Sequence, residues 1–308
     1  MEEWVRKLRQ LCVDDYINKS AESVAQKIKQ PHIPRSLFKY RAYSANALDN
    51  LEKDTLWSAH PNAFNDPYDC SLHFEIEGFD RRIVNSILEL GLLGEDEIAA
   101  VEASSDPLTF AVDRLKEKFP EQKGLSQSGF LNSLLDEMHA PRDLLVKQLK
   151  DSVSICSLCE RIDSLLMWGH YGSNHEGFAM EYDFSAGAVN KDLKDSLWPV
   201  VYENKVYSIQ NVIFGKKARE FNQLFKVGAV TTKCLDWSYE KEWRLISRNP
   251  EASNGSLVSV PKPVAIYLGS NMKDEPQSEI IRLATIKKVP VFKMKLARGQ
   301  FKMEPVKL

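Results

Sequence analysis

Residues 237–247 read WSYEKEWRLIS and combine a strand signal with a pair of acids. Leu245 and Ile246 form a short apolar run, which is typical of a buried strand. Glu240 and Glu242 lie two positions apart just before this run. Side chains two apart in a strand point to the same face, so we expect both carboxylates on one face, roughly 7 Å apart. The pair is either part of a solvated strand edge or directed at a ligand.

Further strand signals lie on both sides of this stretch and predict an α+β fold. We expect a mixed or antiparallel sheet built from residues 37–60 and 153–298, with helices at 163–172, 207–227 and 273–284. The strand candidates are LFKYRAY (37–43), TLWSAH (55–60), SVSICSL (152–158), EGFAMEYDF (176–184), LWPVVYEN (197–204), AVTTKCL (229–235), GSLVSV (255–260), PVAIYLG (263–269) and KKVPVFKMKL (287–296).

Helical patterns define the expected domain organisation. Residues 1–30 form an N-terminal helical segment that ends at PHIPRS (31–36), because its two prolines disfavour helix. We expect residues 31–308 to form a single α+β domain. Apolar residues at i, i+3 and i+4 predict a helical insertion within it at about 81–150.

Composition restricts the class of protein. The 308 residues are 43% hydrophobic and 27% charged, values close to those of soluble globular proteins. The net charge of −2 gives no global positive field, so a nucleic-acid partner is possible but not indicated. No apolar stretch reaches the ~18 residues of a membrane helix, and the charged N-terminus has no signal core. We therefore expect a cytoplasmic protein without a membrane partner.

Cys156 and Cys159 form the CxxC of the chain. A second ligand pair of matching spacing is not present, and strand alternation would direct the two thiols to opposite faces. We expect two small core residues and no metal. The five scattered cysteines fit reduced thiols better than a disulfide framework.

The stretch MWGHYGSNHEGFAMEYD (167–183) concentrates aromatic rings and imidazoles. Trp168, His170, Tyr171 and His175 suit a pocket that stacks a ring and hydrogen-bonds its polar edge. The alternative is a helix end and loop whose aromatic side chains close the core.

Two N-terminal stretches add candidate ligand-binding residues. In the first expected strand, Lys39 and Arg41 share a face with Tyr43, while Tyr40 points the other way. Two cations side by side suit a phosphate clamp, although charges also protect an edge strand.

FNDPYD (64–69) is rich in turn-forming residues. The side chain of Asn65 or Asp66 can hydrogen-bond the nearby backbone, and the ring of Pro67 fixes the φ angle of Pro67 itself. Such a loop either holds backbone amides at a ligand or is a rigid turn.

Four blocks resemble, in the same order, the bacterial family called domain of unknown function 2971. They are LFKYRAY (37–43), LWSAHPNAFNDPYD (56–69), LLMWGHYGSNHEGFAMEYD (165–183) and WSYEKEWRLI (237–246). VAIYLGSNM (264–272) resembles a later block of that family. The resemblance implies no activity, but we expect the four blocks to converge on one cleft, with Arg41 and Glu242 on the same side of the molecule.

YEKEWRLI (239–246) is also similar to the glutamate motif of arginine-serine-glutamate ADP-ribosyltransferases. This similarity implies that Glu242 stabilises an oxocarbenium-like transition state and that Glu240 acts on the acceptor. It also implies that Arg41 grips a phosphate of NAD and that Ser58 stands for the serine block. The chain departs from that pattern because it lacks a Ser-Thr-Ser triplet.

These features favour an enzyme that processes NAD or another nucleotide, by ADP-ribosyl transfer or NAD glycohydrolysis. A toxin or defence effector is one biological role that fits such an enzyme. NAD is then a substrate, Arg244 binds near Glu242 and keeps it ionised, and the macromolecular acceptor is unknown. One alternative is a metal-dependent phosphodiesterase or nuclease that uses His170, His175, Asp66 and Glu242. Another is a non-catalytic nucleotide-binding sensor.

Overall fold

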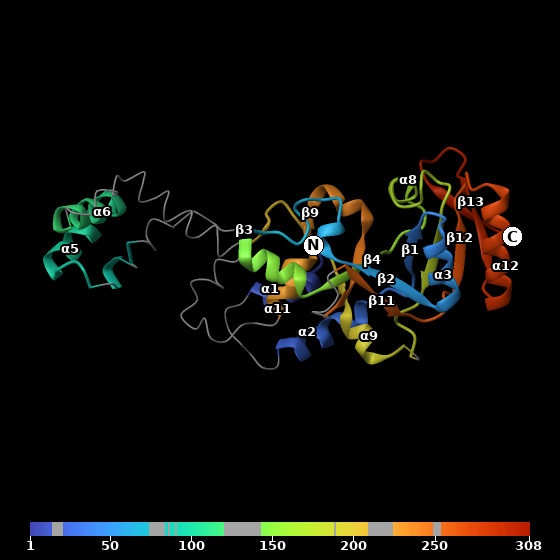
Figure 1. Ribbon diagram of the computed structural model, residues 1–308, viewed down its shortest axis with the longest axis horizontal. Coiled ribbons are helices and arrows are strands. Elements are labelled where there is room, and N and C mark those ends of the chain that lie inside the picture. Colours follow the sequence, from blue (N-terminus) through green and yellow to red (C-terminus); the bar gives the residue numbers. More distant parts are fainter. Residues whose placement is uncertain are drawn as a thin grey trace. The chain divides into compact units, whose positions relative to one another are not determined.

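A computed structural model describes residues 1–13, 21–73, 84–85, 87–89, 91–119, 143–187, 189–208, 224–248 and 254–308. In these residues the fold is α+β, as the sequence predicts (Figure 1). Its centre is a mixed, mostly antiparallel sheet of ten strands.

The sheet joins strands from both ends of the chain. Its path is β11-β2-β4-β1-β5-β12-β13-β14, and β10 joins β4 and β6 to it. The strands β12 and β13 are parallel and are connected by α12 (Asp274–Lys287), since parallel neighbours need a crossover. The ten strands are β1 (Leu37–Arg41), β2 (Thr55–Ala59), β4 (Ser154–Cys159), β5 (Phe178–Tyr182), β6 (Leu197–Pro199), β10 (Glu242–Ser247), β11 (Gly255–Ser259), β12 (Ala265–Leu268), β13 (Val291–Leu296) and β14 (Met303–Lys307).

The strand β4 is the branch point of the sheet. One of its edges pairs with β10 along its whole length. The other edge is shared, because β1 meets it at Phe38–Cys159 and β2 meets it at Ala59–Ile155. The helix α3 (Ala45–Lys53) connects these two strands, and Ser44 caps its N-terminus by accepting from the Ala47 N–H. The sheet therefore splits along this edge of β4.

Alternation along β4 separates two cores. Cys156 belongs to a large apolar cluster with Leu37 and Leu245. Cys159 belongs to a second cluster with Phe38 and Trp168. The two thiols therefore lie on opposite faces of the sheet, as the sequence predicts.

The N-terminal segment is helical, with α1 (Glu3–Val13), α2 (Ala21–Lys29) and the 3-10 turn η1 (Gln30–His32). Leu8 and Cys12 form the buried side of α1. This helix packs against α2 and α11 (Leu224–Thr231).

The remaining elements of this part of the fold are short. They are η2 (Pro61–Ala63), β3 (Leu72–His73), α8 (Leu165–His170), α9 (Lys191–Ser196), β7 (Val201–Glu203), β8 (Tyr207–Ser208), β9 (Thr232–Cys234) and η3 (Leu235–Glu240). The strand β7 pairs in parallel with β9.

Two sequence predictions need correction. AVTTKCL (229–235) is a strand only in part, since α11 continues to Thr231 and β9 covers the next three residues. A short apolar run does not distinguish a buried helix from a strand. The last strand, β14, extends the sheet beyond the expected limit of 298. Residues 209–223 of the helix expected at 207–227 lie outside the described residues.

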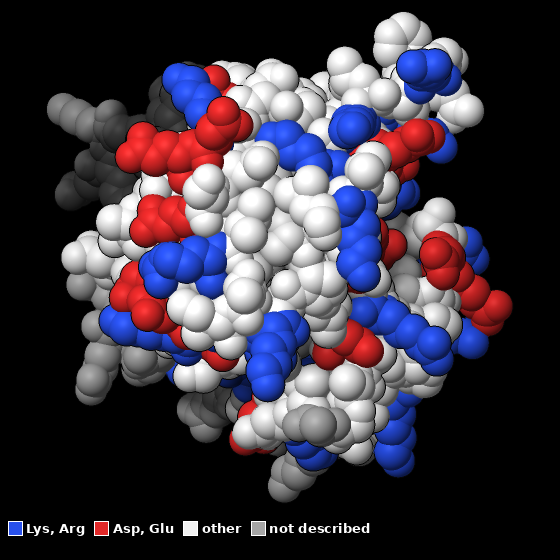
Figure 2. All heavy atoms as spheres, turned by 90° about the vertical axis from the view of Figure 1, so that its right-hand side faces the viewer, with Lys and Arg blue, Asp and Glu red and all other residues white. Residues whose placement is uncertain are grey.

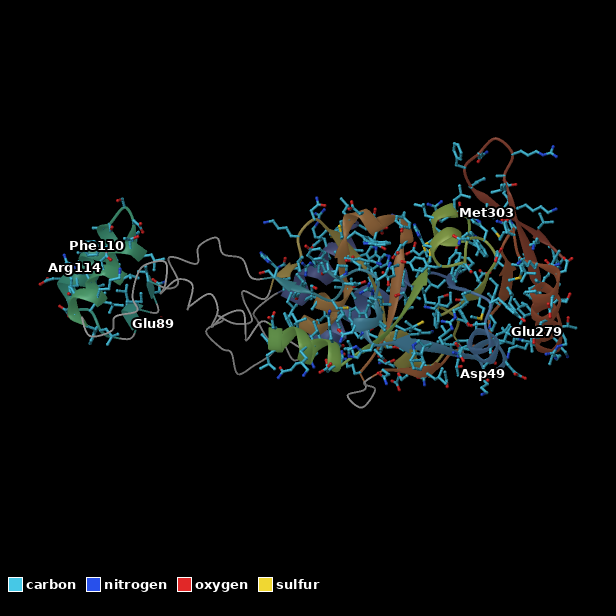
Figure 3. All side chains as sticks on the ribbon, turned by 45° about the horizontal axis from the view of Figure 1, so that its top comes forward. Asp49, Glu89, Phe110, Arg114, Glu279 and Met303 are labelled. Carbon is cyan, nitrogen blue, oxygen red and sulfur yellow. The ribbon has the colours of Figure 1, made fainter. Side chains whose placement is uncertain are left out.

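Contacts between residues divide the chain into two compact units. Unit 1 comprises Met1–Ser71, Gln148–Tyr207 and Phe214–Leu308, and unit 2 comprises Leu72–Lys147 and Ser208–Ile213. The second unit contains α5 (Glu95–Ala103) and α6 (Pro107–Lys118) around an apolar cluster of its own. On α6, the Arg114 guanidinium lies 5.1 Å from the centre of the Phe110 ring (Figure 3). The limits predicted for the N-terminal segment and the helical insertion stay predictions.

The surface around α12 mixes Lys and Arg with Asp and Glu side chains (Figure 2). This mixture is consistent with the small net charge of the chain. Among the helices of the described residues, none combines the length and apolar character that crossing a bilayer requires.

Candidate functional site

A pocket of about 410 Å³ lies beside the branch point of the sheet in unit 1. Each of the four sequence blocks contributes to its wall. The lining residues are Phe38, Lys39, Tyr40, Ala63, Phe64, Asn65, Asp69, Ser157, Leu158, Cys159, Met167, His170, Tyr171, Lys233, Glu240 and Glu242.

The two glutamates of the opening stretch reach this pocket by a different route from the expected one. Glu240 is the last residue of the 3-10 turn η3, and β10 begins only at Glu242. Between them, Lys241 has a φ of 46°, which turns the chain sharply. The expectation that both acids belong to one strand is therefore wrong, although both are buried in the same wall.

Lys233 joins the two glutamates. Its Nζ donates to Glu240 Oε2 at 2.5 Å and to Glu242 Oε2 at 3.1 Å. The same ammonium lies 4.0 Å from Asp69 Oδ2 and 5.1 Å from the centre of the Trp237 ring. One cation from β9 thus fixes the relative position of three carboxylates.

Arg244 holds the other side of the cluster and is fully buried. Its Nε and Nη2 donate to the two oxygens of Glu242 at 2.8 and 3.1 Å. Its Nη1 and Nη2 donate to the two oxygens of Asp69 at 2.7 and 2.8 Å. Nη1 also donates to the Val230 carbonyl at 2.6 Å. Arg244 is not among the residues that line the pocket. Its contacts with Glu242 are those that the sequence predicts, and a contact of Arg244 with a substrate stays a prediction.

The environments of the two glutamates shift their pKa values in opposite directions. Burial alone would raise the pKa of Glu242, but Arg244 and Lys233 outweigh it and lower the pKa to about 2. Burial raises the pKa of Glu240, and the negative charge of Glu242 adds to this effect against the opposing effect of Lys233. Glu242 is therefore held as an anion, whereas the pKa of Glu240 is shifted towards its protonated form.

The helix α8 supplies the aromatic side of the pocket. Ser164 caps this helix, and Tyr171 follows its last turn. The Tyr171 hydroxyl donates to Glu240 Oε1 at 2.6 Å. The His170 ring centre lies 6.3 Å from the ring centres of Tyr171 and Tyr239. Both residues predicted here, His170 and Tyr171, line the pocket.

A turn with left-handed backbone angles follows α8, and His175, at its end, lies outside the lining of the pocket. Ser173, Asn174 and His175 have φ angles of 50°, 52° and 68°, which cost energy for residues with a Cβ atom. His175 is not among the lining residues of the pocket. Its carbonyl instead accepts from the Asn271 N–H at 2.9 Å.

Several other predicted residues have structural roles. Trp168 is fully buried and donates from Nε1 to the Ile162 carbonyl at 2.7 Å, which confirms the core interpretation. Asp66 accepts from the Tyr68 N–H at 2.8 Å in the predicted turn and does not line the pocket. Ser58 is buried on β2 and does not line it either.

The expected phosphate clamp on β1 does not form as a unit. Lys39 lines the pocket and donates from Nζ to the Ser157 carbonyl at 2.9 Å. Arg41 lines a separate pocket between α3 and β2. The hydroxyl of Tyr43 donates to Glu279, far along the chain on α12. Tyr40 lines the first pocket, with its hydroxyl bound to the Arg161 carbonyl.

The residues of the proposed metal-dependent nuclease do not converge. His170 and Glu242 line the pocket, whereas His175 and Asp66 lie outside its lining. In the described part of the chain, no three His, Cys, Asp or Glu side chains are grouped as a metal ion requires.

Sequence reasoning missed two members of the cluster, Lys233 and Asp69. Lys233 interrupts the apolar run AVTTKCL, and a lysine in such a run requires a buried anionic partner. Asp69 closes the turn-rich FNDPYD, where turn chemistry accounts for the neighbouring Asp66 and leaves Asp69 unexplained. The sequence thus marks both residues as unusual, but it does not show which side chains Lys233 and Asp69 contact.

Comparison with known proteins gives a limited result. No curated protein and no solved structure matches the chain. The comparisons thus give no similarity to ADP-ribosyltransferases. Residues 167–245, which include most of α8 and both glutamates of the pocket, match the family model described as "Protein of unknown function (DUF2971)", so this part of the chain carries that domain.

Proposed function

We propose that the pocket binds a nucleotide with a ribose–nitrogen bond, with NAD as the leading candidate, and that the chain cleaves this bond or transfers the sugar to an acceptor. The observation that carries the proposal is the opposite shift of two neighbouring carboxyl pKa values, with Glu242 lowered to about 2 and Glu240 raised. Pairs of titratable groups with divergent pKa values are typical of acid–base sites.

Glu240 is the residue assigned to the reacting atoms. Both oxygens of Glu242 accept hydrogen bonds from Arg244, and one also accepts from Lys233. Glu240 instead receives one bond from Tyr171 and one from Lys233, and no guanidinium holds it. Glu242 is therefore a positioning residue that fixes Lys233 beside Glu240. This assignment exchanges the roles implied by the ADP-ribosyltransferase similarity.

The charge of the cluster suits a cationic reaction centre. Asp69, Glu240 and Glu242 contribute three negative charges when ionised, and Lys233 and Arg244 contribute two positive charges, which leaves one excess negative charge. Cleavage at the ribose C1′ develops positive charge on the sugar, and a nearby carboxylate stabilises it.

Bond breaking and bond formation both take place at the ribose C1′. The C1′–N bond breaks and its electron pair leaves with nicotinamide. A bond then forms between C1′ and the oxygen of water or of an acceptor hydroxyl. The Glu240 carboxylate takes the proton of that oxygen, because a raised pKa makes a carboxylate a stronger base.

The size and polar lining of the pocket support a nucleotide ligand. Its volume of about 410 Å³ lies within the ~300–1,000 Å³ of small-molecule sites. Lys39 is a lining cation without a carboxylate partner among the described residues, which makes it available to a phosphate oxygen. Tyr40, Tyr171 and His170 supply ring surfaces.

The test is release of nicotinamide from NAD by the purified protein, with and without a chelator. We expect metal-independent release that falls ~10²–10³-fold in Glu240→Gln, the usual effect of removing one electrostatic contact of this kind. Glu52→Gln, a substitution on the exposed side of α3, is the matched control.

Other results would redirect the assignment. NAD binding without turnover in the wild-type protein favours the non-catalytic sensor. Cleavage of nucleic acid that a chelator abolishes favours the nuclease. Full nicotinamide release in Glu240→Gln would remove Glu240 from the reaction.

A further inference from the structure

A second pocket of about 300 Å³ lies in unit 1 between α3, β1, β2 and β11. The residues that line it are Arg41, Asn46, Asp49, Asn50, Trp57 and Leu257. None of these residues lines the glutamate pocket. The second pocket therefore has a wall and a chemistry of its own.

The apolar wall consists of two side chains that solvent reaches. Trp57 is 39% exposed and Leu257 is 55% exposed. They face each other as cross-strand partners of β2 and β11. Exposed aromatic and aliphatic side chains that adjoin within a pocket mark a binding surface more often than isolated ones do.

Gly255 fixes the position of the indole. Its φ is 117°, and a Cβ atom there would lie 2.6 Å from Trp57 Cζ2 and 2.5 Å from the Ser58 carbonyl oxygen. The Trp57 ring therefore lies against bare backbone on one side. A ring held in this way presents its other surface for stacking.

The polar wall combines a cation with two amides. Arg41 forms no salt bridge with a carboxylate among the described residues, although it lines the same pocket as Asp49. Asp49 is paired with Lys53 at 2.7 Å instead. Asn46 and Asn50 add hydrogen-bonding groups from α3.

Residues of β1 contribute to both pockets. Lys39 lines the glutamate pocket and Arg41 lines the second one, two positions along the same strand. Two residues of a strand span roughly 7 Å. A dinucleotide has two halves, each with a ring, joined by an anionic pyrophosphate. The two halves correspond to the two pockets, and the pyrophosphate corresponds to the two cations on β1.

We propose that the second pocket binds the adenylate half of the dinucleotide, with the purine stacked on Trp57 and its phosphate bound by Arg41. This inference rests on the proposed function, which assigns the ribosyl–nicotinamide half to the glutamate pocket. A purine offers a flat surface to the indole and polar edges to the amides of Asn46 and Asn50. The guanidinium of Arg41 matches a phosphate in charge and geometry.

The experiment measures binding of AMP and of nicotinamide mononucleotide by calorimetry. The wild-type protein should bind AMP, and Trp57→Ala should weaken this binding about 5- to 150-fold, as expected for the loss of one base–aromatic stack. Trp57→Phe should restore most of the affinity because it keeps a ring. Binding of nicotinamide mononucleotide should stay unchanged in both variants.

Matched controls use an aromatic and a cation outside both pockets. Phe301 is 99% exposed on the β13–β14 connection, so Phe301→Ala removes an exposed ring without touching either pocket. Arg41→Gln should weaken AMP binding because it removes the proposed phosphate contact. Arg298→Gln removes a cation outside both pockets and should leave AMP binding unchanged. If Trp57→Ala does not fold, Leu257→Ser tests the same wall from the neighbouring strand.

The outcomes separate this inference from the proposed function. Nicotinamide release together with unchanged AMP affinity in Trp57→Ala overturns the adenylate pocket and leaves the function intact. Trp57-dependent AMP binding without release supports the pocket and overturns the chemistry. Absence of AMP binding to the wild-type protein overturns the inference directly.

Discussion

Arg244 and Asp69 lie 175 positions apart and form a buried ion pair through two parallel hydrogen bonds of 2.7 and 2.8 Å. The pair ties β10 to the turn that follows β2. Removing one member leaves the other as an uncompensated charge in the interior, which is far costlier than the loss of an exposed pair.

We therefore predict that Arg244→Met and Asp69→Asn each lower the free energy of unfolding by about 3–5 kcal/mol. Urea unfolding followed by circular dichroism measures this change. Glu3→Gln removes the exposed pair of Glu3 with Lys7 and should leave the unfolding midpoint unchanged. Equal urea unfolding midpoints for Asp69→Asn and Glu3→Gln would show that the buried pair does not stabilise the fold.

Glu242→Gln and Glu240→Gln should differ in stability. Glu242 is charged in the fold and carries the contacts of Arg244 and Lys233, so its loss should lower the free energy of unfolding by about 3 kcal/mol or more. Glu240 is held by one lysine and one tyrosine and by no guanidinium among the described residues, so Glu240→Gln should cost less. A thermal melt of each variant at pH 7 checks the order.

The same contrast predicts the response to acid. The pKa of Glu242 is about 2 in the fold and about 4.3 in an unfolded chain, so the unfolded state binds the proton first as the pH falls. Its stabilising contribution is complete above about pH 4.3 and is lost towards pH 2. Unfolding free energies at pH 6, 4 and 3 should converge between the wild-type protein and Glu242→Gln. A difference that does not shrink with acid would contradict this assignment.

Gly177→Ala should be strongly destabilising. A Cβ atom at this position would lie 2.2 Å from the Arg41 carbonyl oxygen and 2.9 Å from that of Gly172, so backbone has to move. We expect a loss of about 3 kcal/mol, at the upper end of the usual cost of overpacking. The measurement is again a urea titration.

Gly169→Ala is its control, eight residues earlier in α8. Nothing lies within 4 Å of a Cβ atom there, and alanine favours helix over glycine by up to about 1 kcal/mol. This variant should match or exceed the wild-type stability. Equal losses at the two glycines would mean that the contact with Arg41 is not the cause.

Lys29 should make stability rise with pH above neutrality. It is fully buried, donates to the carbonyls of Lys194 and Asp195 at 3.0 and 2.9 Å, and lies 4.1 Å from the centre of the Trp198 ring. Burial lowers its pKa to about 7, against the opposing effect of Asp195 and Glu22 and with a further lowering by Lys191.

The direction of this pH dependence follows from the protons that Lys29 binds in the folded and unfolded states. An unfolded lysine holds its proton to about pH 10, so between pH 7 and pH 10 the unfolded state binds more protons and rising pH favours the fold. The slope for one proton is at most about 1.4 kcal/mol per pH unit. Lys29→Met should reduce the slope measured from urea unfolding at pH 7, 8 and 9. Parallel slopes in the two proteins would exclude Lys29 as the source.

Local patterns predicted much of the fold. Local strand signals predicted β4, β10 and β12, because these signals act between near neighbours. The same signals did not reveal where α11 ends, since every residue of this helix except Lys226 is buried.

The candidate site was harder to predict because its members are joined by charge over long separations. Glu240 and Glu242 stood out by their spacing, but Lys233 and Asp69 became recognisable only when folding placed them against the glutamates. The proposed exchange of roles between the two glutamates depends on Arg244. Its contact with Glu242 follows from local spacing, whereas its contact with Asp69 exists only in the folded chain.

The branching of the sheet at β4 has a consequence for the order in which the protein matures. Since β10 occupies one edge of this strand and β1 and β2 share the other, the pocket wall is incomplete until segments from both ends of the chain have docked on it. On the ribosome, β1, β2 and β4 are all made before Glu240 and Glu242. The wall of the pocket therefore closes only after β10 has been made, and a translation product that stops before β10 lacks Glu242 and the strand that occupies this edge of β4.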